Sequence, residues 1–133
     1  MLKAITIALT LFGEASGEST EGKRAVASVI WTRALLTRAH GDTNRLVAVC
    51  LAPKQFSCWN DGRRPRVPGD YPSRAAWAEC KAIADEMCAG TFKPTITATH
   101  YYSGKKAPYW VASMTLVREI GGHRFYVETE GAK

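Results

Sequence analysis

The sequence predicts an α+β protein that is mainly helical and carries a small β-hairpin or sheet near its C-terminus. Apolar residues recur at helical spacing along the first two thirds of the chain, whereas residues 115–128 alternate as strands do around a pair of glycines. The chain has 133 residues, of which 46% are hydrophobic, so it is long enough to bury one core. We therefore expect a single domain over residues 1–133.

The first helix is predicted from an apolar run close to the N-terminus. In "MLKAITIALTLFG", Ile5, Ala8, Leu9 and Phe12 share one helical face, which predicts a buried helix that ends near Phe12–Gly13. The same run also has the features of a short signal peptide. Nothing near it resembles an A-x-A cleavage site, and the run is too short to span a bilayer. We favour the helix and expect no cleavable signal.

Three more helices are predicted downstream. One covers residues 20–39 and is broken by "HGDTN", where Asp42 or Thr43 can cap a short helix through "RLVAVCLA". Another covers residues 73–89, and Gly90 ends it because glycine readily takes the left-handed conformation.

The remaining segments are predicted to be a loop and strands. Residues 52–73 are rich in proline and glycine, which indicates a long loop of the kind that is usually functional. "TITATHYY" is rich in β-formers, and "TLVREI" and "HRFYVE" flank Gly121-Gly122 as the two strands of a hairpin.

The charge of the chain indicates an anionic partner. Lysine and arginine exceed aspartate and glutamate by 18 to 12, a formal net charge of +6. Nucleic acid, a membrane surface and an acidic polymer such as the bacterial cell wall all fit this balance. The basic residues are scattered apart from "GRRPR", so a contribution to solubility alone is the competing interpretation.

Four cysteines leave two interpretations open. Cys80 and Cys88 lie about 12 Å apart on one helix, too far for a disulfide between them, but each can reach the segment that holds Cys50 and Cys58. One or two disulfides and four free thiols therefore both fit the sequence. The spacings match neither a zinc ribbon nor a C-x-x-C redox motif.

Two further kinds of site are weighed against the sequence. "QFSCW" fits a thiol enzyme in which Gln55 is the oxyanion donor, Cys58 the nucleophile and His123 the base. The cysteines are explained more simply as structural. The three histidines show no close ligand spacing, so we expect no metal site and no cofactor, and chelators should not inhibit.

Glu14 and Glu18 in "FGEASGES" are the candidates for acid–base chemistry. As an exposed pair at i, i+4 they would repel each other, and the glycine before each makes a regular helix interior a poor setting. If the helix ends near Gly13, Glu14 lies against apolar residues. Such a setting raises the pKa of a carboxyl and keeps it protonated as a general acid. Glu14 is thus a candidate for glycoside chemistry.

Four motifs of the chain, taken in order, resemble those of the SleB-type cell-wall hydrolases. They are "FGEASGESTEGKRAVASVIWTR", "PKQFSCWN", "ATHYY" and "IGGHRFY". The resemblance covers most of the chain and implies a lysozyme-like, mainly helical fold. It also implies an enzyme that cleaves the glycan strands of peptidoglycan, typically as a lytic transglycosylase. It implies that Glu14 is the catalytic acid and base. The residues that it implies to line or support the saccharide groove are Gln55, Phe56, His100, Tyr101, Tyr102 and His123.

Residue alternation refines this set. In a strand, Tyr101 and Tyr102 face opposite sides, and His100 shares the face of Tyr102. We therefore favour His100 and Tyr102 as the substrate-binding pair of this motif. Glu18 is a possible assisting residue, although a cap or ion pair at the start of the second helix is the favoured role.

The resemblance also sets the expected reaction and partners. Glu14 protonates the glycosidic oxygen between N-acetylmuramic acid and N-acetylglucosamine and then deprotonates either the sugar's 6-hydroxyl or water. The alternatives are a hydrolytic muramidase with the same site, a cysteine amidase or peptidase, and a basic binding module without activity. We expect a monomer that binds peptidoglycan strands, with no nucleic-acid partner and no membrane insertion. It would act in the periplasm or on the outer face of the wall, in the manner of a phage endolysin or a bacterial hydrolase.

Overall fold

The structure is a computed structural model that describes residues 2–36, 42–52, 56–62, 66–69 and 73–129. Helices come first and the sheet last, as expected for the mainly helical α+β class. The elements are the α-helices α1 (Leu2–Ala15), α2 (Thr20–Leu36), α3 (Asp42–Leu51) and α4 (Ser73–Ala89), the 3-10 helices η1 (Ser57–Gly62) and η2 (Tyr109–Ser113), and the strands β1 (His100–Ser103), β2 (Met114–Ile120) and β3 (His123–Glu128).

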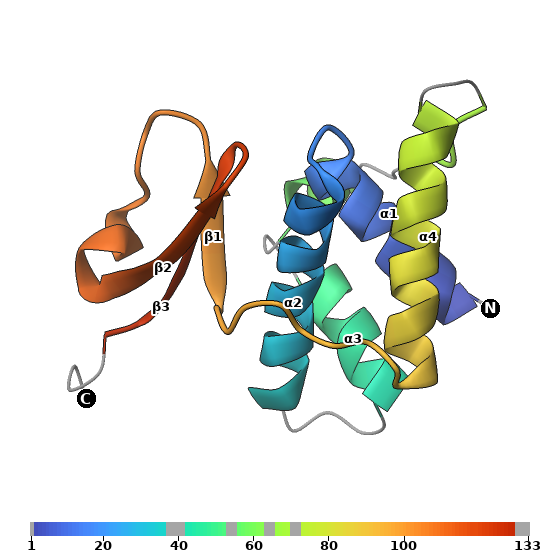
Figure 1. Ribbon diagram of the computed structural model, residues 1–133, viewed down its shortest axis with the longest axis horizontal. Coiled ribbons are helices and arrows are strands. Elements are labelled where there is room, and N and C mark those ends of the chain that lie inside the picture. Colours follow the sequence, from blue (N-terminus) through green and yellow to red (C-terminus); the bar gives the residue numbers. More distant parts are fainter. Residues whose placement is uncertain (1, 37–41, 53–55, 63–65, 70–72, 130–133) are drawn as a thin grey trace.

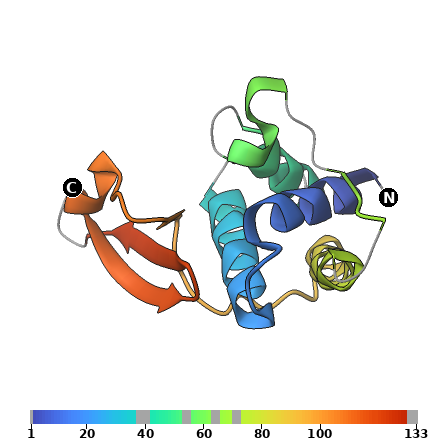
Figure 2. The ribbon, with the colours of Figure 1, turned by 90° about the horizontal axis from the view of Figure 1, so that it is seen from above.

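The sheet stands beside the helices, with α2 between it and the other helices (Figures 1 and 2). In Figure 2 α4 is seen end-on while α1 lies across the view, so these two helices cross at a steep angle. A long extended segment runs from the end of α4 past α2 to β1. This path brings the C-terminal strands close to the junction between α1 and α2.

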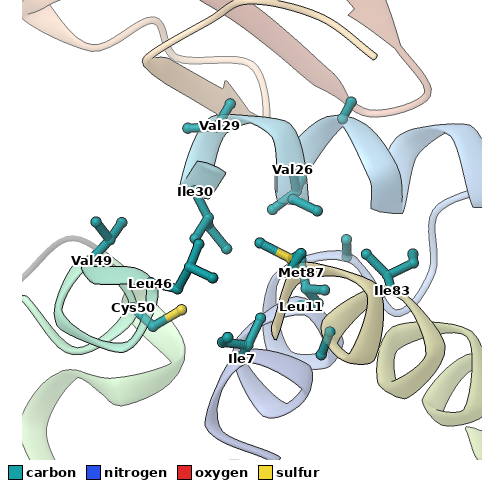
Figure 3. Close-up of a cluster of buried hydrophobic side chains, with 14 of the residues drawn as sticks. Ile7, Leu11, Val26, Val29, Ile30, Leu46, Val49, Cys50, Ile83 and Met87 are labelled. Atoms are coloured by element: carbon teal, nitrogen blue, oxygen red, sulfur yellow. The ribbon is translucent and has the colours of Figure 1, made fainter. Parts of the chain in front are cut away.

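The core is built from the facing sides of the four α-helices (Figure 3). Ile7 and Leu11 of α1 are fully buried there, and Ala4, Ala8 and Ala15 extend their row. The predicted stripe of α1 is therefore wrong in part, because Ile5, Leu9 and Phe12 are only half-buried.

Helix α1 is apolar on more than one side, so periodicity alone did not identify the side that is buried. Two rows of α1 satisfy helical spacing, and the row with Ile7 and Leu11 is the one that lies in the core with residues of α3 and α4 (Figure 3). Phe12 instead packs edge-on against Trp77 of α4, with ring centroids 6.1 Å apart. Helix α1 also continues through Gly13 to Ala15, two residues beyond its predicted end.

A buried lysine ties the start of α2 to α4. Lys23 is 3% exposed, and its ammonium lies 3.0 Å from a carboxylate oxygen of Glu79. Val26, Val29 and Ile30 form the buried row of α2. At the end of α4, Gly90 has φ +79°, as its role in stopping that helix requires.

The three strands form an antiparallel sheet in the order β1–β3–β2. The predicted hairpin is confirmed, with Gly121 at φ +57° in the turn. A β-bulge between Leu116 and Arg118 shifts the register of β2 against β3. In the register, Tyr101 of β1 is opposite Phe125 of β3, so their side chains share the face of the sheet that is turned to the helices.

All four cysteines, at positions 50, 58, 80 and 88, are free thiols in the structure. Cys50 and Cys80 are buried, and Cys58 and Cys88 are half-buried. Of the two interpretations open from the sequence, the structure has the one without disulfides. Within the described residues, no helix is both long enough and apolar enough to cross a membrane.

Candidate active site

Glu14 is held by groups from two distant parts of the chain. It occupies the last turn of α1, where one carboxylate oxygen, Oε1, accepts a hydrogen bond from the Tyr101 hydroxyl at 2.7 Å. The other oxygen, Oε2, accepts a longer hydrogen bond from the backbone N–H of Cys58, with the two atoms 3.4 Å apart. Glu14 therefore lies where the end of α1, η1 and the sheet meet.

Helix η1 is itself anchored on α1. The indole Nε1 of Trp59 donates to Thr10 Oγ1 at 2.9 Å, and the Thr10 hydroxyl donates to the carbonyl of Thr6 at 2.8 Å. Thr10 is fully buried, and these two bonds satisfy its hydroxyl. This anchor places the N–H of Cys58 beside Glu14.

Tyr101 reaches Glu14 from a cluster of aromatic rings. Its ring centroid is 5.2 Å from that of His123, 5.7 Å from that of Phe125 and 6.4 Å from that of Phe56. Burial raises the pKa of the Tyr101 phenol well above its ordinary value, and the charge of Glu14 and its hydrogen bond raise it further. The phenol therefore stays neutral and acts as a hydrogen-bond donor to Glu14.

Phe56 and Arg33 lie beneath the same cluster. Phe56 is 1% exposed, and the Arg33 guanidinium carbon is 5.6 Å from the centroid of its ring. Arg33 Nε donates to the carbonyl of Thr99 at 2.6 Å, which fixes the strand just before β1. Phe56 thus supports Tyr101 from inside the core. Gln55, the other groove residue predicted from this motif, lies outside the described residues.

The predicted pair His100 and Tyr102 lies on the other face of the sheet. Their rings pack against Trp110 of η2, with centroid distances of 5.0 and 6.1 Å, and Tyr102 also stacks on Tyr126. Burial and the nearby Arg33 charge lower the pKa of the His100 imidazole. The alternation that placed these two residues together is right, but Tyr101 is the member of "HYY" that meets Glu14.

Glu18 and His123 meet at the β2–β3 turn. Glu18 Oε1 accepts the N–H of Gly122 at 3.1 Å and lies 3.6 Å from His123 Nδ1. His123 is 5% exposed. The cap at the start of α2 that was predicted for Glu18 is made instead by Ser19, whose hydroxyl oxygen accepts the N–H of Gly22 at 3.1 Å.

The surroundings of Cys58 do not favour a thiolate. Burial raises the pKa of its thiol to about 12, and the negative charge of Glu14 contributes in the same direction. A catalytic thiol needs the opposite shift, toward neutral pH. Among the described residues, no group of three histidine, cysteine, aspartate or glutamate side chains is placed to hold a metal ion.

Comparison with known proteins supports the fold and identifies the family. The chain resembles two solved catalytic domains: that of the germination-specific lytic transglycosylase SleB from Bacillus anthracis, and that of the SleB protein from Bacillus cereus. The first is 22% identical with a TM-score of 0.64 and 93% coverage of both chains. The second is 23% identical with a TM-score of 0.62, covering 95% of this chain and 91% of the other.

A search among curated proteins finds no match. A family model described as cell wall hydrolase matches residues 17–126, which is most of the chain, although the match begins three residues after Glu14. The chain therefore belongs to the cell wall hydrolase family.

Proposed function

We propose that this protein cleaves the β-1,4 bond between N-acetylmuramic acid and N-acetylglucosamine in peptidoglycan, as a lytic transglycosylase, with Glu14 as its acid and base. The observation that carries the proposal is the contact of Glu14 with the neutral Tyr101 phenol at the meeting point of helices and sheet. Membership of the cell wall hydrolase family supports the substrate. The SleB domain of similar fold is described as a lytic transglycosylase, which supports the reaction type.

The proposed reaction uses one carboxyl group twice. Protonated Glu14 donates its proton to the glycosidic oxygen while the bond from that oxygen to C1 of the muramic acid breaks. The carboxylate that results then accepts the proton of the same sugar's 6-hydroxyl, whose oxygen attacks C1 and closes a 1,6-anhydro ring. Tyr101 holds the carboxyl in one orientation through both steps because its hydroxyl donates to Oε1.

Glu18 is poorly placed for the role of second catalytic carboxylate. Its Oε1 is occupied by the Gly122 N–H and lies close to His123. Glycosidases that activate a water or form a glycosyl-enzyme use two carboxyl groups, one on each side of the bond. Attack by the sugar's own hydroxyl needs no second carboxylate, so the arrangement favours the transglycosylase over the hydrolytic muramidase.

The remaining roles complete the proposal. Phe56 and His123 support the Tyr101 ring and hence the acid, while contacts of His100, Tyr102 and Gln55 with the saccharide stay predictions. The protein acts as a single domain and as a monomer in the periplasm or on the outer face of the wall. The net charge of +6 favours the anionic wall.

Replacement of Glu14 by glutamine tests the proposal. Glu14→Gln keeps the size and shape of the side chain and removes the proton donor, so release of soluble fragments from purified peptidoglycan should fall at least ~100-fold. Circular dichroism should show an intact fold. Glu21→Gln, at an exposed glutamate of α2, is the matched control and should retain activity. Normal turnover by Glu14→Gln would remove Glu14 from the mechanism.

A further inference from the structure

Glu18 is four residues beyond Glu14, yet its carboxylate belongs to a different part of the molecule. It lies in the short loop between α1 and α2, and its side chain is 18% exposed. Oε1 accepts the N–H of Gly122 at 3.1 Å and lies 3.6 Å from His123 Nδ1. Among the described residues, that buried ring nitrogen has no hydrogen-bond partner. The Glu18 carboxylate therefore faces both the Gly122 amide and the His123 ring of the β2–β3 turn.

The glycines around Glu18 leave room for this contact. A Cβ atom on Gly121 would overlap the carboxylate oxygen Oε1 of Glu18, and the φ of +57° at Gly121 disfavours other residues as well. A Cβ atom on Gly22 would lie 2.8 Å from the Cβ of Glu18, closer than real Cβ contacts. The turn and the start of α2 are thus both shaped to accept the Glu18 side chain.

The loop that carries Glu18 is fixed from the helical side. Lys23 Nζ donates to the backbone carbonyl of Glu18 at 2.5 Å and is paired with Glu79 of α4 at 3.0 Å. Ser19 accepts the N–H of Gly22 and so caps α2 next to it. Because α2 and α4 hold the loop, the Glu18 carboxylate is a fixed point against which the turn rests.

The contact between Glu18 and the β2–β3 turn is connected to Glu14 through His123 and Tyr101. His123 directly follows Gly122, and its ring centroid is 5.2 Å from that of Tyr101. In the sheet, His123 is opposite Ser103, two residues beyond Tyr101 on β1. The Tyr101 hydroxyl then donates to Glu14. A shift of the turn away from the loop would therefore move Tyr101 relative to Glu14.

We propose that Glu18 is a positioning residue, which holds the β2–β3 turn on the α1–α2 loop and thereby sets the Tyr101 hydroxyl on Glu14. This inference rests on the proposed role of Glu14. Glu18 itself contacts no reacting atom in this scheme. Its effect on turnover passes through Tyr101.

A double-mutant cycle on turnover tests this route. Glu18→Ala should lower kcat roughly 10- to 100-fold, the scale of a small misplacement of a catalytic group, with little change in KM. Tyr101→Phe should lower kcat as well. In the Tyr101→Phe background, Glu18→Ala should lower kcat further by less than about threefold, because the contact that Glu18 maintains is already lost.

Matched variants separate positioning from loss of structure. Glu18→Gln keeps an acceptor oxygen for Gly122 and should restore most of the turnover. Glu21→Ala removes the exposed ion pair between α2 and Arg118 of β2, another contact between helices and sheet. That variant should leave kcat within about twofold, since exposed pairs contribute little.

Two readouts do not depend on activity. Hydrogen exchange of the Gly122 amide should be at least about tenfold faster in Glu18→Ala and unchanged in Glu18→Gln, because this amide donates to the carboxylate. In an ultraviolet titration, the tyrosine assigned to Tyr101 by its loss in Tyr101→Phe should ionise at lower pH in Glu18→Ala, since it moves away from Glu14.

The outcomes distinguish the two proposals. Two results would overturn the role of Glu18. One is a double variant whose loss of kcat equals the product of the losses in Glu18→Ala and Tyr101→Phe. The other is an exchange rate of the Gly122 amide that Glu18→Ala leaves unchanged. A wild-type protein without turnover on peptidoglycan would overturn the proposed function alone. The exchange and titration results would then decide whether Glu18 positions Tyr101.

Discussion

The hydroxyl of Tyr101 and the carboxyl of Glu14 form the contact on which the proposed acid chemistry depends. The two residues are 87 positions apart in the chain, and their oxygens are 2.7 Å apart in the structure. A phenol that remains neutral keeps its proton and can donate a hydrogen bond to Glu14. The raised pKa of Tyr101 therefore suits the proposed role of its hydroxyl as a hydrogen-bond donor.

Tyr101→Phe should lower turnover while leaving the fold intact. A hydrogen bond to a charged group contributes about 1.5–3 kcal/mol, which corresponds to roughly a ten- to hundredfold loss of kcat. The control is Tyr109→Phe, because the Tyr109 side chain on η2 is 94% exposed. Equal rates for Tyr101→Phe and the wild type would show that this hydrogen bond has no part in catalysis.

Cys58 gives a second prediction at the same scale, and it concerns pH. Its thiol has a pKa raised to about 12, so the protonated form prevails at all pH values below that. Since the thiolate is the reactive form, alkylation by iodoacetamide at pH 8 should be much slower than for a cysteine in an unfolded peptide. Cys58→Ser should keep most of the activity. Rapid alkylation that also abolishes turnover would revive the thiol-enzyme interpretation.

At the scale of residues, the sequence predicted the proposed acid but only part of the surroundings in which the structure places it. Glu14 was found from its motif and from the apolar run before it. His100 and Tyr102 were favoured over Tyr101 as the site pair of the "HYY" motif, because alternation says that neighbours in a strand face opposite sides without saying which side faces α1. That choice depends on how the sheet docks on the helices, which is a long-range property of the fold.

At the scale of elements, the hairpin and α1 show what local patterns do and do not determine. The β2–β3 turn was predicted because Gly121-Gly122 lies between two alternating segments, a strictly local signal. The end of α1 was predicted two residues early. Gly13 lowers helix propensity, but tertiary packing of the last turn against η1 and the sheet outweighs that preference.

The buried side of α1 supports a prediction that compares two isoleucines. Ile7 is fully buried, whereas Ile5 is half-buried. Ile7→Ala should lower the free energy of unfolding by about 2–5 kcal/mol, the range for deleting a buried aliphatic side chain. Ile5→Ala should cost clearly less. Urea unfolding measures both, and a larger loss for Ile5→Ala would mean that α1 presents its other side to the core.

At the scale of the whole molecule, the chain folds so that residues far apart in the sequence meet at the candidate site. Glu14 comes from the first helix, and Tyr101 and His123 come from the sheet that ends the described chain. Helix α2 lies between the sheet and the rest of the helices, as Figures 1 and 2 show. The fold class and the family follow from patterns along the whole sequence, whereas the site depends on this docking of the sheet against the helices.

Mass spectrometry of the soluble fragments from digested peptidoglycan tests the central claim most directly. Intramolecular attack by the 6-hydroxyl leaves no water in the product, so wild-type digests should contain muropeptides that end in 1,6-anhydro-N-acetylmuramic acid. Glu14→Gln digests should lack them. Reducing ends alone would assign a hydrolytic muramidase to the same carboxyl. Free amino termini of the stem peptides with intact glycan strands would mean amide cleavage and would contradict the account.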